Sequence, residues 1–297
     1  MRQRTVERIG VAMALVIAVA NAAAADSAVP DGRCAPDALA AGTVCLDRYE
    51  VSVWRVPGPD TANASLVAKI RLGIADRGDL VAAGATPLGG RGDDYAPCAD
   101  DGQSCGDLYA VSIASVVPAA FVTWFQAQQA CANSGKRLPT SAEWQVGANG
   151  TPDPGPDDGV LDCNTSVRGT PALTGERSRC TSARGVSDAV GNLSEWAADW
   201  VPLSTACPGW ASFSDDFMCL AGANTTKAAP GALLRGGSFL DGATAGPFAI
   251  SGSFDPTRAE DSIGFRCARP LPEPGGYAQL GVGLAAVVML GRRRSSR

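Results

Sequence analysis

The sequence contains no histidine among its 297 residues. This absence excludes nucleophile systems that depend on an imidazole base, such as Ser-His-Asp triads and Cys-His pairs. It also excludes His-Glu-x-x-His zinc sites, histidine-ligated haem and the two-histidine facial triad that holds iron. Any reaction at this protein must therefore use carboxylates, thiols, hydroxyls or a bound metal.

Long basic runs and internal repeats are also absent. The 25 Lys and Arg residues stand against 30 Asp and Glu residues, so the net charge is −5. Nucleic-acid-binding proteins carry clustered positive charge, and we therefore expect no nucleic-acid partner. Hydrophobic residues make up 45% of the chain, which is enough to bury a core and excludes a disordered protein.

The first 25 residues carry the pattern of a secretory signal peptide. Three arginines precede an apolar run over 9–20, and Ala23-Ala24-Ala25 offers small residues for cleavage before Asp26. The run is shorter than the roughly 20 residues of a membrane-spanning helix, although an uncleaved anchor is the alternative. In either case we expect an exported protein.

Residues 271–297 resemble a sorting signal. Pro272-Glu273-Pro274 is followed by an apolar stretch over 275–291 and then by three consecutive arginines. This pattern resembles the PEP-CTERM signals that bacterial exosortases process, and residues 271–275 resemble a sortase signal with proline in place of threonine. A plain C-terminal anchor helix is the alternative. We expect exosortase or sortase processing, membrane contact through this segment, and a location at the cell surface or outside the cell.

Ten cysteines, an even number spread over the whole length, indicate an oxidising compartment. Connectivity does not follow from spacing alone, but proximity in the sequence suggests four short pairings. These pairings join Cys34 with Cys45, Cys98 with Cys105, Cys163 with Cys180, and Cys207 with Cys219.

Between the two ends, the chain divides into a short N-terminal segment over 26–43 and one domain over 44–270. Residues 45–53 alternate in hydrophobicity and predict a strand with Glu50 on its less buried face. Residues 57–118 are rich in Gly, Pro and Asp and give only weak signals.

Two helices are predicted from their capping residues. Thr123 can cap a helix that ends at Ser134-Gly135. Thr140 and Glu143 form the pattern of a capping box for a second helix, in which Trp144 faces the core.

Five ordered motifs resemble the formylglycine-generating enzyme (sulfatase-modifying factor) family. They are Val122-Thr-Trp124, Gly135-Lys-Arg-Leu-Pro-Thr140 with Glu143-Trp144, Gly185-Val-Ser-Asp-Ala-Val-Gly-Asn-Leu-Ser-Glu-Trp196, Arg235-Gly-Gly-Ser-Phe239 and Ile263-Gly-Phe-Arg-Cys-Ala268. The resemblance covers about 120–270, with 47–51 as the family's early strand. It implies an α+β, C-type-lectin-like fold that is loop-rich and braced by disulfides.

The resemblance also implies a calcium site. The matching family positions bind calcium through two side chains, here Asp188 and Glu195, and two backbone oxygens, here Gly191 and Leu193. Asn164 matches the start of a second calcium segment. Oxygen ligands at this spacing suit a hard cation. The alternative is that the two carboxylates cap turns or meet an arginine.

The family's redox metals are not expected here. Family oxidases hold copper(I) through two thiolates just after the Arg-Gly-Gly-Ser motif, because soft metal prefers sulfur. No cysteine occurs over 220–266, and an ungapped alignment places Asp241 and Gly246 at the two positions. The related iron-dependent sulfoxide synthases need histidine ligands. In the family, as in lectin folds generally, a disulfide joins the positions of Cys131 and Cys267.

The sequence therefore predicts an exported, surface-associated, sulfatase-modifying-factor-like protein without oxidase activity. It would act as a module that binds a peptide or glycan in a groove, and the groove residues are expected to be Arg235, Ser238, Asp241 and Arg258. The alternative is an enzyme, a divergent formylglycine-generating oxidase that converts a sulfatase cysteine to formylglycine.

Overall fold

The computed structural model describes residues 34–271 except 93, 154, 156, 227 and 228. The predicted signal peptide, and all but the first residue of the predicted sorting segment, lie outside the described residues. Within the described part of the chain, no helix combines the length and the hydrophobicity that crossing a bilayer requires.

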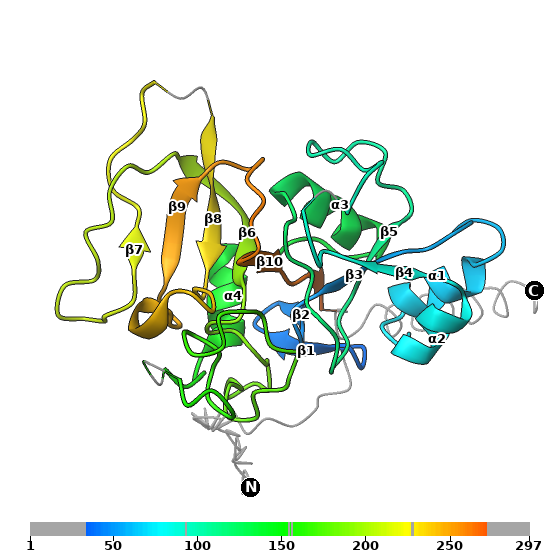
Figure 1. Ribbon diagram of the computed structural model, residues 1–297, viewed down its shortest axis with the longest axis horizontal. Coiled ribbons are helices and arrows are strands. Elements are labelled where there is room, and N and C mark those ends of the chain that lie inside the picture. Colours follow the sequence, from blue (N-terminus) through cyan, green and yellow to red (C-terminus); the bar gives the residue numbers. More distant parts are fainter. Residues whose placement is uncertain (1–33, 93, 154, 156, 227–228, 272–297) are drawn as a thin grey trace, which may run out of the picture.

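Short strands of the described chain form three sheets (Figure 1). The first is antiparallel, in the order β1 (Ala38–Ala41), β2 (Val44–Asp47), β11 (Ala268–Pro270). The second has the order β10 (Ile263–Phe265), β6 (Ser194–Pro202), β8 (Pro230–Arg235), β9 (Ile250–Phe254), β7 (Met218–Cys219). The third is antiparallel, in the order β4 (Thr86–Leu88), β3 (Ser52–Arg55), β5 (Leu108–Val111).

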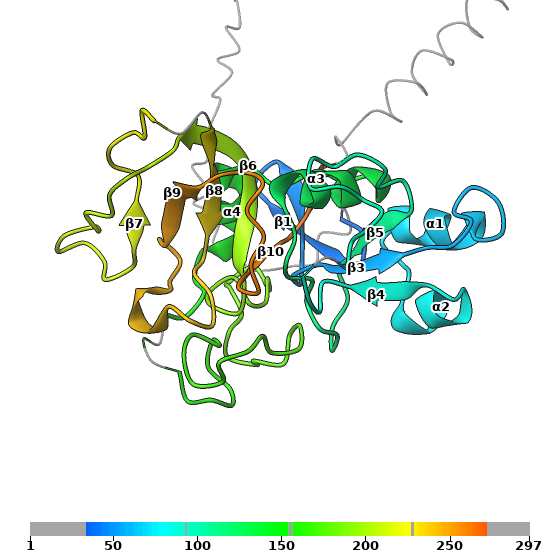
Figure 2. The same ribbon diagram turned by 45° about the horizontal axis from the view of Figure 1, so that its top comes forward.

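The helices of the described residues are short. They are α1 (Ala64–Arg71), α2 (Arg77–Ala82), α3 (Trp124–Asn133) and α4 (Ser141–Ala148), with a single 3-10 turn, η1 (Gly242–Thr244). Helices α1 and α2 lie at one end of the molecule, beside the sheet that contains β3 (Figures 1 and 2).

The two helices predicted from their caps are confirmed. Thr123 accepts the N–H of Gln126 at the start of α3, and Thr140 accepts that of Glu143 at the start of α4. Each cap satisfies an N–H group that has no partner within the helix. Trp144 is buried, as expected, where α4 packs against β1 and β2.

The mixture of short helices and sheets joined by loops confirms the predicted α+β, loop-rich fold class. The predicted strand over 45–53 is wrong in its extent, because the chain forms β2 and β3 with a break between them. Glu50 lies at this break and is fully buried, although the alternation predicts the less buried face for it. Its carboxylate accepts the N–H of Leu193 at 2.9 Å, a distant contact that hydrophobic alternation does not register.

Buried clusters surround the loop over 185–193, whose Val190 and Leu193 each belong to a small cluster of their own. Trp196 and Phe265 belong to a core that also contains residues of α3, β3 and β5. Val186 belongs to a second core, between α4 and the first sheet. The loop leads from one core to the other, so its residues are held from both sides.

Five disulfides brace the domain and include all ten cysteines. Four join near neighbours, as proximity suggested, and the fifth joins α3 to the residue before β11, as the resemblance implied. The pairs are Cys34–Cys45, Cys98–Cys105, Cys131–Cys267, Cys163–Cys180 and Cys207–Cys219. This number of disulfides indicates an extracellular or exported protein.

Candidate functional site

The loop over 185–196 brings several polar side chains into one buried cluster. Asp188 and Asn192 have φ angles of 58° and 56°. This left-handed conformation is rare outside glycine, and Asp and Asn adopt it more readily than most residues. Asp188, Asn192 and Glu195 are all buried, and Asn192 contacts the Glu50 carboxylate.

Glu195 forms a buried ion pair. Its Oε2 accepts hydrogen bonds from Arg266 Nε at 2.6 Å and from Trp144 Nε1 at 2.7 Å, and its Oε1 contacts Arg266 Nη2. Both carboxylate oxygens are therefore engaged by protein donors. The Glu195 carboxylate thus meets an arginine, as in the alternative interpretation of the sequence.

Asp188 and Asn164 each keep one buried oxygen without a partner among the described residues. Asp188 Oδ2 accepts the N–H of Gly175 at 2.6 Å, whereas Oδ1 has no donor. Asn164 Nδ2 donates to the Thr170 oxygen at 3.0 Å, and its Oδ1 also has none. Gly191 packs directly against the Asn164 backbone. Calcium binding by this loop, through Asp188, Glu195 and the backbone oxygens of Gly191 and Leu193, stays a prediction.

Glu50 is the member of this cluster that the sequence analysis missed. Its Oε1 accepts the N–H of Leu193, so it anchors the loop. Burial, followed by the negative charges of Asp188 and Glu195, raises the pKa of Glu50 well above its usual range. Burial likewise raises the pKa of Asp188 to about 7. Arg266 acts in the opposite direction on both carboxyls, so it is the main counter-charge of the cluster.

Ser238 and Asp241 are joined by hydrogen bonds in the turn that follows β8. Asp241 Oδ2 accepts hydrogen bonds from the Ser238 N–H at 2.7 Å and its hydroxyl at 2.8 Å. Gly237 has φ +74°, and a Cβ there would lie 2.7 Å from the Ala245 Cα, so only glycine fits. The hydroxyl that was expected to face a ligand is thus used within the turn.

The two predicted groove arginines have separate partners. Arg235 lies 4.7 Å from the centre of the Trp144 ring, contacts Gln145 Oε1 and donates to the Pro247 oxygen at 3.2 Å. Burial lowers the pKa of Arg235 to about 10. Arg258 lies between β9 and β10 and pairs with Glu260. Among the described residues, no hydrogen bond or ion pair links Arg258 to the other three groove residues.

Gly246, which the ungapped alignment matches to the family's second thiolate, has no room for a side chain. Gly246 lies directly against the Asp216 carboxylate, and a Cβ built on Gly246 would overlap it. Asp216 is held there because its Oδ2 accepts the N–H of Phe248 at 2.7 Å. In the ungapped alignment, a carboxylate oxygen thus occupies the space beside the position matched to the second thiolate.

Gly246→Ala is expected to lower the free energy of unfolding by about 1–3 kcal/mol, the usual cost of overpacking a closed site. Gly106 supplies the matched control, because no atom lies within 4 Å of a Cβ built there. Gly106→Ala should change stability by less than about 1 kcal/mol. Urea denaturation of the two variants measures the difference. Equal effects would mean that the Asp216 carboxylate does not close the position.

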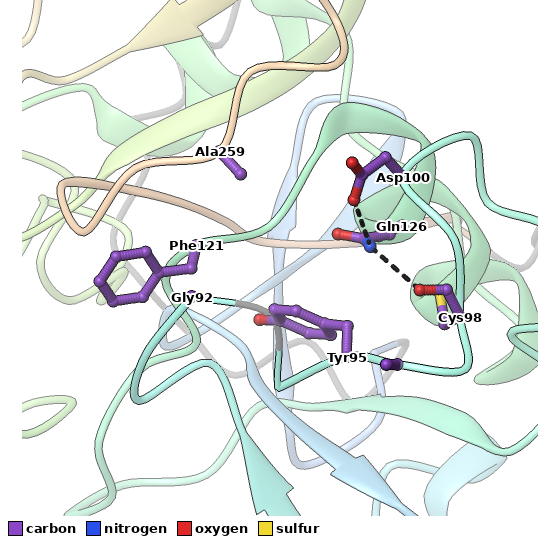
Figure 3. Close-up of a pocket in the computed structure, with 8 residues that line it drawn as sticks. Gly92, Tyr95, Cys98, Asp100, Phe121, Gln126 and Ala259 are labelled. Carbon is purple, nitrogen blue, oxygen red and sulfur yellow. Dashed lines mark hydrogen bonds between the residues drawn. The ribbon is translucent and has the colours of Figure 1, made fainter.

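A cavity of about 220 Å³ lies between the loop before α3, the start of α3 and the loop after β9 (Figure 3). Its lining consists of Gly92, Tyr95, Ala96, Cys98, Asp100, Phe121, Gln126 and Ala259. Gln126 Nε2 donates to Asp100 Oδ1 and to the Cys98 oxygen, both at 3.4 Å. Phe121 has φ +54°, a conformation that a bulky residue adopts only when its surroundings hold it.

Comparison with known proteins shows one family and several distant structures. The family model described as "Sulfatase-modifying factor enzyme 1-like domain" matches residues 99–271. No curated protein sequence matches the chain.

Among solved structures, the Major Tropism Determinant M1 variant is 20% identical, with a TM-score of 0.43 over 78% of this chain and 51% of that chain. This chain thus spans about half the length of that protein. CarF is 18% identical, with a TM-score of 0.38 over 77% of this chain and 87% of that chain. PvdO from Pseudomonas aeruginosa is 19% identical, with a TM-score of 0.35 over 77% of this chain and 80% of that chain.

Proposed function

Because this chain belongs to the sulfatase-modifying factor enzyme 1-like domain family, we propose that it is an exported member that binds a glycan and lacks copper-dependent oxidase activity. One observation supports the proposed lack of oxidase activity. All ten cysteines form disulfides, so no thiolate is free to hold copper(I).

The two positions that would carry the copper thiolates support the same conclusion. Asp241 offers oxygen rather than sulfur, and that oxygen already accepts two hydrogen bonds from Ser238. Gly246 offers no side chain and faces the Asp216 carboxylate. Cys207 and Cys219 pair with each other, so they do not replace the missing ligands. Copper(I) does not fit these residues, since it prefers soft sulfur ligands.

The cavity of Figure 3 supports the binding role. It places the Phe121 ring in the same lining as the Asp100 carboxylate and the Gln126 amide. An aromatic face packs on the C–H face of a sugar ring, and a carboxylate accepts hydrogen bonds from its hydroxyls. The volume of about 220 Å³ lies below the roughly 300–1,000 Å³ of typical small-molecule pockets, so no more than one sugar unit is expected to enter it.

The disulfides and the two ends of the sequence support the proposed export. The five disulfides are typical of a protein from an oxidising compartment. The signal-peptide pattern over 1–25 and the sorting pattern over 271–297 agree with this location at the level of the sequence. We accordingly expect the protein to be located at the cell surface or outside the cell, where conditions are oxidising, rather than in the reducing cytoplasm.

One purified preparation tests both the activity and the binding. Incubation with copper, reductant, oxygen and a Cys-x-Pro-x-Arg peptide should yield no aldehyde, because the chain lacks the two thiolates. A screen of immobilised glycans should show binding that Phe121→Gly weakens by a factor of roughly ten or more, as expected when a stacking ring is lost. Glycine removes the ring and also tolerates the positive φ of residue 121.

Phe213→Ala is the matched control for the binding, since Phe213 is an exposed aromatic residue outside the cavity. It should leave glycan binding unchanged. An aldehyde product would overturn the non-oxidase assignment and favour the divergent formylglycine-generating oxidase. Binding to peptides but to no glycan would overturn the ligand class.

A further inference from the structure

Three aspartates from distant parts of the chain meet beside β7. Asp153 follows α4, while Asp215 and Asp216 lie between β6 and β7, in the loop that the Cys207–Cys219 disulfide closes (Figure 1, the yellow segment leading into β7). One carboxylate oxygen from each residue lies within 4.8 Å of the other two. None of the three belongs to the loop over 185–196 that matches the family's calcium positions.

Asp216 gives this cluster a feature that surface acids lack. The residue is only 1% exposed. Its Oδ2 accepts the N–H of Phe248, whereas its buried Oδ1 has no hydrogen-bond partner among the described residues. A buried carboxylate oxygen without a donor is destabilising unless a cation or a water molecule satisfies it.

The charges around the cluster leave it negative. Among the described residues, no lysine or arginine forms an ion pair with Asp153, Asp215 or Asp216. Burial raises the pKa of Asp216, and the positive charge of Arg235 counteracts this increase. The Arg235 guanidinium, however, forms its hydrogen bonds with Gln145 and Pro247. The three carboxylates therefore repel one another when no cation lies between them.

We propose that Asp153, Asp215 and Asp216 form a calcium-binding site. Carboxylate oxygens are hard ligands, and calcium accepts six to eight oxygens at about 2.3–2.6 Å in irregular loop geometry. Two ligands on opposite sides of a calcium ion are then about 5 Å apart, a span that includes the oxygen separations found here. Magnesium needs shorter, octahedral contacts, which three carboxylates from two loops do not easily supply.

The site would lie beside the position that carries the second copper thiolate in the family's oxidases. Asp216 fills the space next to Gly246 that a cysteine side chain would occupy. A soft-metal ligand is thus replaced by part of a hard-metal site. A bound ion would join the disulfide-closed loop to the segment after α4, so calcium should stabilise the folded protein.

Counting bound ions in the full-length protein tests the proposal. Equilibrium dialysis against calcium, followed by elemental analysis, should show that Asp216→Asn binds one ion fewer than the parent. The amide oxygen of the introduced asparagine can still accept the Phe248 N–H, so the loop keeps its anchor. Asp215→Asn changes an exposed residue and should weaken the same ion by a factor of roughly ten or more, since it removes one charged ligand. Calcium should raise the melting temperature of the parent more than an equal concentration of magnesium does.

Asp188→Asn separates this site from the family's calcium positions. It should leave the ion at Asp216 in place, whether or not the parent binds a second ion. Unchanged stoichiometry in both Asp216→Asn and Asp215→Asn would overturn the proposal, and an equal or larger response to magnesium would overturn the assignment to calcium. Because no aldehyde or glycan is measured, the result does not depend on the proposed function.

Discussion

Replacing Arg266 by methionine is expected to lower the free energy of unfolding by about 3–5 kcal/mol. The Arg266 side chain has no exposed surface, and its guanidinium pairs with the Glu195 carboxylate. It also donates to the backbone oxygens of Ser187 at 3.0 Å and Asp47 at 3.1 Å, so it joins three segments of the chain. Without it, Glu195 would keep a buried charge with only the Trp144 N–H as a donor among the described residues.

Arg258 provides the matched control for this measurement. Its side chain is 54% exposed and pairs with Glu260, so Arg258→Met should cost less than about 1 kcal/mol. The double variant Glu195→Leu with Arg266→Met should recover part of the loss, because it also removes the buried Glu195 carboxylate that Arg266→Met alone leaves unpaired. Urea denaturation of the parent and the three variants measures these differences. A cost below about 1 kcal/mol for Arg266→Met would contradict the role of the ion pair.

Removing the Cys131–Cys267 disulfide is expected to cost about 5 kcal/mol in the loop-entropy picture, the largest effect of any disulfide in the protein. The two residues are separated by 136 positions, so the bond restricts a large part of the unfolded chain. Both cysteines are fully buried, and alanine at each position would also leave a small void.

The Cys98–Cys105 disulfide gives the comparison, since its separation is only 7 positions. Replacing both of these cysteines by alanine should cost about 2.5 kcal/mol on the same basis. Denaturation midpoints of the two double variants, measured at equal pH and salt, provide the test. A smaller loss for the long-range pair than for the short pair would mean that chain entropy does not dominate its contribution.

Features that depend on neighbouring residues could be predicted from the sequence. The N-caps of α3 and α4 place donor and acceptor three residues apart, so the spacing of Thr123 with Gln126 and of Thr140 with Glu143 is visible in the sequence. The four short disulfides follow from proximity in the same way. The resemblance of the ordered motifs to a known family predicted the fold class and the long-range Cys131–Cys267 disulfide.

Contacts between distant residues could not be predicted. Alternation reports only the local strand and therefore predicts a less buried position for Glu50, whereas its partner Leu193 lies 143 residues away. Arg266 stood within a recognised motif, but nothing local identifies Glu195, 71 residues earlier, as its partner. A carboxylate that could bind calcium and one that binds an arginine have the same sequence signature.

The candidate metal site could not be predicted from the sequence either, because its residues come together only in the folded protein. Asp215-Asp216 is an ordinary acidic pair in a loop, and Asp153 follows a proline in a segment with strong turn signals. Only the packing of Asp216 against Gly246 shows that one carboxylate is buried. Burial and the meeting of two loops are tertiary properties, and they decide whether such residues bind a cation or remain hydrated.

The pairing of β11 with β2 determines how the domain would carry a mechanical load. Cys34 is bonded to Cys45 in β2, and Arg269 of β11 lies opposite Cys45 in the ladder. A pull applied at residues 34 and 271 would therefore act across this one short ladder, and the Cys131–Cys267 bond would stop the last strand from peeling further than residue 267. Arg266 lies next to Cys267 and donates to the Asp47 oxygen at the end of β2, so the buried ion pair would be the first part of the core to feel such a pull.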